Sequence, residues 1–173
     1  MQFPPESPLS PDGSNPTKFV VELAPLELMP HAVYTFLQTV DNGLWNEVSI
    51  GGDNIQNKPT SSAEFRQIAR HIVVAQPRKD ALEDYLNNFG IPTMSFPEFN
   101  ERYDHEKYTV GYIAAHPGPS FYISLEDNKE SHVGDPCFGK IISGFETVDR
   151  ISSSPRNGQV LDPPVKIVGV GWA

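Results

Sequence analysis

The sequence predicts a mostly-β domain, built as an antiparallel barrel or sandwich with two or three helices. The first observation is a series of about seven or eight short apolar stretches separated by turn residues, a spacing typical of all-β domains. The second is that few segments have helical periodicity, too few to alternate with strands in a parallel α/β sheet. The third is composition: 38% of the 173 residues are hydrophobic and 10% are aromatic, enough for a buried core.

Charge and cysteine content exclude several function classes. The formal net charge of −9 at pH 7 argues against nucleic acid or an anionic membrane as the main partner. No apolar run is long enough for membrane insertion, and the first residues lack a signal-peptide pattern, so we expect neither feature and predict no compartment. Cys137 is the single cysteine, and the five histidines lack metal-ligand spacing, so we expect no metal and no other cofactor.

The N-terminal part of the chain predicts a tail, a strand and a helix. Residues 1–16 contain five prolines and no apolar periodicity, which is typical of a flexible or polyproline-like tail before a domain over 17–173. Residues 17–24 alternate as in a half-buried strand. A helix is expected to begin at Pro30 and to stop at Gly43. Its apolar positions repeat at helical spacing: Val33, Phe36, Leu37 and Val40.

The rest of the chain predicts further short strands and two shorter helices. A polar loop near 51–62 is interpreted as an insertion in the domain. Helical spacing covers 79–92 and 144–152, with proline and glycine at the ends. Strands are expected over 44–50, 70–77, 108–115, 120–125, 137–142 and 163–172.

Three motifs, in this order, resemble the cyclophilin family of peptidyl-prolyl cis–trans isomerases. They are PHAVYTFL at 30–37, GPSFYI at 118–123 and CFGKIISGFETV at 137–148. The likeness is strongest over two blocks, about 17–50 and 107–152. It implies an eight-stranded antiparallel β-barrel capped by two helices. It also implies a rotamase that acts on, or binds, proline-containing peptides or protein clients, as a monomer or a subunit of a complex.

The resemblance also implies which residues form the site. Rotation about the bond before proline crosses a barrier of ~20 kcal/mol, which a pocket for the proline ring and a hydrogen-bonding arginine lower without any cofactor. Arg66 is the expected electrostatic catalyst. The implied peptide-binding residues are Val74, Gln76, Ala114, Ala115, His116, Phe121, Tyr122 and Asp135.

The arginine and glutamine of the family motif can be placed in more than one register. Aligning Arg66 with the arginine puts Val74 at the glutamine, whereas aligning Gln76 with the glutamine puts Ile68 at the arginine. A β-bulge would restore both positions, because Arg66 and Gln76 have the same parity along a strand. Another register places the Phe-His-Arg positions at 50–52 and leaves no arginine.

Other family positions carry different residues in this chain. The asparagine corresponds to Ala115, the pocket phenylalanine to Tyr122 and the tryptophan to Glu130. The pocket histidine corresponds to Asp135, with His132 three residues earlier. These departures predict isomerase activity that is weak or lost. The alternative is a noncatalytic protein-binding or structural module.

Neighbouring positions on a strand point to opposite sides of the sheet. We therefore expect Phe121 to lie in the core and Tyr122 to face the groove. Arg66 has two readings, as the catalyst of this groove or as a solvated charge beside the polar insertion.

Overall fold

The structure is a computed structural model of the chain that describes residues 17–46, 48–53, 71–74, 79–90, 97–114, 120–157 and 160–172. It is mostly β with a few helices, as the sequence predicts. The elements in chain order are β1 (Val20–Leu23), α1 (Pro30–Asp41), β2 (Ser49–Asp53), β3 (His71–Val74), α2 (Lys79–Phe89), β4 (Thr109–Tyr112), β5 (Phe121–Ser124), β6 (Cys137–Ser143), α3 (Phe145–Ser153), β7 (Arg156–Asn157) and β8 (Val160–Lys166).

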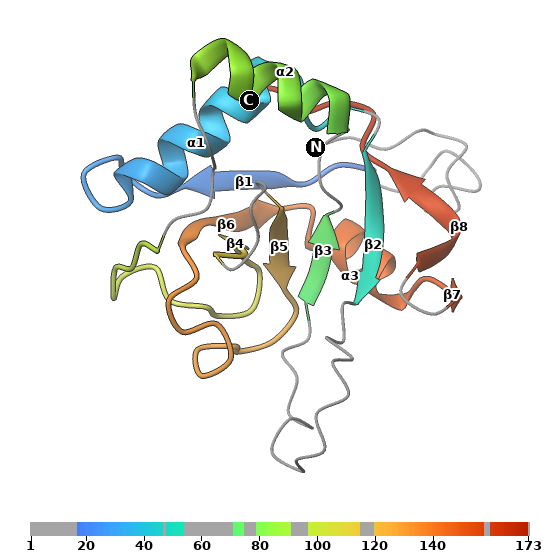
Figure 1. The fold of residues 1–173 in the computed structure, drawn as a ribbon. Coiled ribbons are helices and arrows are strands. Elements are labelled where there is room, and N and C mark those ends of the chain that lie inside the picture. Colours follow the sequence, from blue (N-terminus) through green and yellow to red (C-terminus); the bar gives the residue numbers. More distant parts are fainter. Residues whose placement is uncertain are drawn as a thin grey trace, which may run out of the picture.

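The strands form one antiparallel sheet in the order β1-β6-β4-β5-β3-β2-β8-β7. In Figure 1, β1 runs across the view while β2, β3 and β5 run roughly from top to bottom, so the sheet curls strongly. Within the described part of the chain, no pairing joins the end strands β1 and β7, and the sheet is not closed.

The helices lie at different ends of the curled sheet. Figure 1 shows α1 and α2 above the strands, and α3 lower, beside β2 and β7. Helix α1 begins at Pro30 and is followed by Gly43 at φ +64°, as the sequence predicts. Its buried residues include Val33, Phe36 and Val40. The apolar face of α1 therefore covers the open end of the sheet.

Aromatic rings form the centre of the core beneath α1. Phe121 of β5 packs edge-on against Trp45 and Phe36, with ring centroids 4.7 and 5.7 Å away. Phe138 of β6 lies 4.9 Å from Phe36. Trp45 is fully buried, and its Nε1 donates to Thr39 Oγ1 at 2.8 Å. Such edge-to-face pairs stabilise a core beyond the area that they bury.

The predicted strand over 44–50 is wrong in its first half. Residues 42–46 form turns after α1, because Gly43 and Leu44 donate their backbone N–H groups to Val40 and Thr39 and so close the helix. Leu44 and Trp45 are buried here without strand pairing. Strand β2 begins only at Ser49 and extends to Asp53, into the stretch interpreted as an insertion.

The C-terminal strand also differs from the prediction. Strand β8 ends at Lys166 and begins at Val160, where it pairs with the short β7, a segment whose sequence resembles a polar turn. Its pairing with β2 shifts register between Ile50 and Gly51, so Val165 and Val160 both have partners on β2. A bulge of this kind accommodates the two consecutive prolines of β8, which cannot donate to a ladder.

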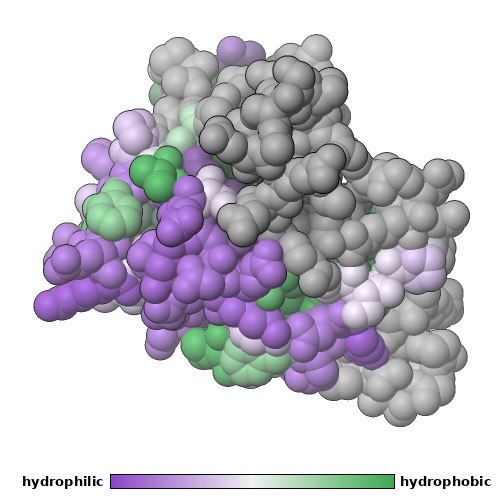
Figure 2. Space-filling model, turned by 90° about the horizontal axis from the view of Figure 1, so that it is seen from below, coloured by the Kyte–Doolittle hydropathy of each residue, from purple (hydrophilic) through white to green (hydrophobic). Residues whose placement is uncertain are grey.

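The face of the molecule seen from below is mainly hydrophilic where the structure describes it (Figure 2). Figure 2, seen from below Figure 1, shows hydrophilic residues over most of its coloured area, with hydrophobic residues in separate spots. Of the helices that the structure describes, none has the length and apolar character needed to cross a membrane.

Candidate functional site

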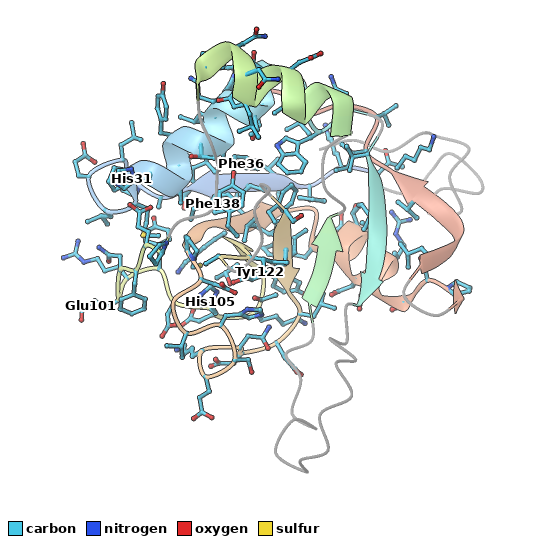
Figure 3. All side chains as sticks on the ribbon, viewed as in Figure 1. His31, Phe36, Glu101, His105, Tyr122 and Phe138 are labelled. Carbon is cyan, nitrogen blue, oxygen red and sulfur yellow. The ribbon has the colours of Figure 1, made fainter. Side chains whose placement is uncertain are left out.

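Strand β5, which carries Tyr122, lies between β4 and β3 in the sheet. The candidate site is built around this strand. Tyr122 is paired with Gly111 of β4 and with Val73 of β3. Its neighbour Phe121 belongs to the aromatic core, whereas the Tyr122 ring contacts histidines outside that core. Figure 3 shows Tyr122 near His105, below the core ring Phe138 in the view.

Four side chains pack together at this point, and we call them the Tyr122 cluster: His105, Tyr122, His132 and Asp135. The Tyr122 hydroxyl lies 3.0 Å from His105 Nδ1. The imidazole of His132 stacks on the Tyr122 ring, with centroids 4.2 Å apart and planes 17° apart. His132 Nδ1 lies 2.8 Å from Asp135 Oδ2. The exposed fraction is 0% for Tyr122, 2% for His105 and 7% for His132, so the three rings are buried, whereas the Asp135 side chain is 18% exposed.

The contacts of His105 determine where its proton lies. Nε2 is 3.0 Å from the backbone oxygen of Asp135, which only accepts, so Nε2 carries the proton. Burial lowers the pKa of His105, which favours the neutral ring with Nδ1 as an acceptor. The Tyr122 hydroxyl therefore donates to Nδ1. Burial raises the pKa of Tyr122 well above its ordinary value, so this hydroxyl keeps its proton.

Asp135 connects the cluster to the end of β4. Its Oδ2 accepts from His132 Nδ1–H, and its Oδ1 accepts from the backbone N–H of Ala114 at 2.9 Å. A buried or half-buried carboxylate needs such donors to offset the loss of water. The structure therefore brings together three of the predicted residues, namely Ala114, Tyr122 and Asp135.

Gly111 makes room for the Tyr122 side chain. A Cβ atom at this position would lie 2.6 Å from Tyr122 Oη and 2.9 Å from the backbone oxygen of Pro136. Both distances are too short for a side chain, and the oxygen of Pro136 belongs to the backbone. The Tyr122 side chain can therefore occupy this position only because residue 111, opposite it on β4, is a glycine.

The described residues near the cluster contain no activated nucleophile. Cys137 is buried, and burial raises the pKa of its thiol to about 11, so the thiolate does not form at neutral pH. No group of three or more potential metal ligands occurs in the described ranges. The described site therefore consists of buried, packed rings and a hydrogen-bond network.

The remaining predicted residues are placed as follows. Val74 ends β3, one residue beyond the partner of Tyr122. Phe121 lies in the core as expected. Tyr122 points away from that core, but its ring is covered, and its role in peptide binding stays a prediction. Arg66, Gln76, Ala115 and His116 lie outside the described residues.

The sequence pattern assigned no role to His105 or His132. His132 precedes Asp135 by three residues in a turn, and this spacing is the one signal that could have linked them. His105 lies in a charged, irregular stretch, 17 residues from Tyr122 in sequence. No local periodicity marks it, so only the fold identifies it.

Comparisons with known proteins bear on the family and on the fold. The family model described as "Cyclophilin type peptidyl-prolyl cis-trans isomerase/CLD" matches residues 13–172. No curated protein matches in a sequence search.

Two solved structures share the fold. One is a cyclophilin-type peptidyl-prolyl cis–trans isomerase of Cryptosporidium parvum crystallised with the dipeptide Ala-Pro, with a TM-score of 0.66 and 15% identity over 88% of this chain and 90% of that chain. Another structure of the C. parvum isomerase has a TM-score of 0.63 and 16% identity over 88% of this chain and 89% of that chain.

Proposed function

The chain belongs to the cyclophilin-type peptidyl-prolyl cis–trans isomerase family, and we propose that it binds proline-containing peptides on the surface over Tyr122, with isomerase activity that is weak or lost. The family match over 13–172 supports proline-containing peptides as the ligand class. The presence of the dipeptide Ala-Pro with the C. parvum protein supports the same class. The observation that supports weak activity is the burial of the Tyr122 ring beneath His132. The aromatic ring at the family's pocket position has no exposed surface.

The proposed architecture is the closed eight-stranded barrel of the family, over residues 17–173 after a tail of residues 1–16. Closure would join β1 to the segment that follows β8. Lys18 and Gly169 each form an isolated β-bridge, and the residues of β1 line one cavity with Gly169 and Trp172. Trp172 Nε1 also donates to Asp41 Oδ1 at 3.2 Å, which holds that segment against the end of α1.

In the proposed mechanism, catalysis is electrostatic. Arg66 would donate to the prolyl carbonyl and favour the twisted imide, while the surface over Tyr122 would hold the proline ring. No proton transfer is required, which is consistent with a cluster whose hydrogen bonds are made within the protein. The alternative is a noncatalytic module that binds a protein partner, alone or in a complex.

An isomerisation assay separates these functions. We expect the purified chain to accelerate cis–trans exchange of a tetrapeptide that contains Ala-Pro only modestly. In Arg66→Ala the catalysed rate constant should fall about tenfold or more. Arg102→Ala is the matched control, because Arg102 is exposed. Full activity in Arg66→Ala would exclude Arg66 as the catalyst. Peptide binding without any acceleration by the unmutated chain would leave the noncatalytic module.

A further inference from the structure

His132 covers one face of the Tyr122 ring. The two rings are nearly parallel at 17°, with centroids 4.2 Å apart, and Tyr122 has no exposed surface. A proline ring that packs on an aromatic residue needs the same kind of flat contact. His132 therefore takes up space that a proline ring over Tyr122 would require.

His132 belongs to the loop of residues 129–134, whose other residues are exposed. Of residues 129–134, His132 is the only buried one, and Val133 beside it is 84% exposed. The base of the loop is held separately, because the backbone N–H of Asn128 donates to the oxygen of His105 at 2.7 Å. Moving the His132 side chain outward would thus open the face of Tyr122 without unfolding the loop.

The contacts of the His132 side chain include the stack on Tyr122, a tilted packing against the His105 ring with centroids 5.3 Å apart, and the hydrogen bond from Nδ1 to Asp135 Oδ2 at 2.8 Å. A stacked ring pair and a single hydrogen bond to a charged group each make a modest contribution to stability. Both are small enough for a ligand to displace and large enough to reduce its apparent affinity.

We propose that His132 is a displaceable cover over Tyr122 that sets the affinity of this surface for proline-containing peptides. The proposal rests on the proposed function, because it takes Tyr122 as the floor of the proline site. A peptide binds only to molecules in which His132 has moved away. The measured affinity is then the affinity of the open site multiplied by the fraction of open molecules.

Calorimetric titration of His132→Ala with an Ala-Pro tetrapeptide tests the proposal. We expect this variant to bind the peptide about tenfold more tightly than the unmutated chain, since it loses at least the stacked pair. Val133→Ala is the matched control and leaves the affinity unchanged, because Val133 is exposed in the same loop. The same peptide with alanine in place of proline shows whether the gain depends on the proline ring.

The outcomes separate the cover from the peptide site. If the unmutated chain binds and His132→Ala binds no more tightly, the cover is overturned while the proposed function stands. If neither protein binds, both are overturned. Should His132→Ala not fold, Asp135→Ala decides instead. It removes the carboxylate that accepts from His132 Nδ1–H and offers no other hydrogen-bonding group, so affinity must rise, and an unchanged affinity overturns the cover.

Discussion

The hydroxyl of Tyr122 donates a hydrogen bond to Nδ1 of His105 across 3.0 Å, in a place where both side chains are buried. The relation joins β5 to the loop before β4. It also fixes the tautomer of His105, whose Nε2–H donates to the backbone of Asp135. A phenylalanine at position 122, as in the family pattern, would not hold His105 in this way.

Tyr122→Phe is expected to destabilise the protein. The substitution keeps the ring but leaves Nδ1 of His105 buried without the hydroxyl donor, which costs about 1–3 kcal/mol in the free energy of unfolding. Urea unfolding of both proteins measures the loss. Tyr34→Phe serves as the control, because Tyr34 is 59% exposed. An equal stability of Tyr122→Phe and the unmutated chain would contradict the role of this bond.

His105 is expected to make the stability depend on pH. Burial lowers its pKa in the folded state below the ordinary value of 6.5, so the unfolded chain binds this proton more readily. The free energy of unfolding should therefore fall as pH decreases through about 6.5, until the folded-state pKa is passed. The contribution of His105 is constant at higher pH.

Chemical unfolding at several pH values between 8 and 5 tests this. The unmutated chain should lose more stability over that range than His105→Gln, which has no titrating group at this position. Parallel curves for the two proteins would show that His105 titrates alike in the folded and unfolded states. A direct NMR titration of the His105 ring gives the same answer independently.

Gly111→Ala is expected to disrupt the Tyr122 cluster from the neighbouring strand. The new Cβ would lie 2.6 Å from Tyr122 Oη and 2.9 Å from the backbone oxygen of Pro136. Overpacking of this kind costs about 1–3 kcal/mol. Thermal and urea unfolding should show the loss, whereas Gly171→Ala should have little effect because nothing lies within 4 Å of its Cβ position. A stable Gly111→Ala variant would mean that Tyr122 can shift freely.

Glu98 is expected to stabilise the N-terminus of α1. The helix receives no side-chain hydrogen bond from its own N-cap residue, Met29. Glu98 supplies the acceptors instead, taking the backbone N–H groups of His31 at 3.1 Å and Ala32 at 2.8 Å. A negative charge at this end also complements the helix dipole.

Glu98→Ala should therefore lower the free energy of unfolding by about 1 kcal/mol. Glu98→Gln keeps an acceptor and should lose less. Glu101→Ala is the matched control for net charge, since Glu101 is exposed in the same loop. The cap would be refuted if Glu98→Ala and Glu101→Ala had the same stability.

Local pattern in the sequence was enough to predict most elements and the family. The helix from Pro30 to Asp41 follows from its proline start, its apolar spacing and Gly43, all within one short stretch. Strands β1, β3, β4, β5 and β6 follow from short apolar runs between turn residues. The half-strand expected at Leu44 failed because the helix cap and the burial of Trp45 outweigh local strand propensity.

Only the tertiary structure determined the candidate site. His105 meets Tyr122 from 17 residues away, and Glu98 reaches Ala32 from 66 residues away. Such contacts depend on how strands pair and loops return, and no periodicity along the chain encodes them. The sequence by itself determined most of the strands and helices and the family that they indicate. The fold decided that His132 lies on Tyr122. His132 is the one buried side chain of residues 129–134, and the way this loop folds back over β5 places it on the Tyr122 ring.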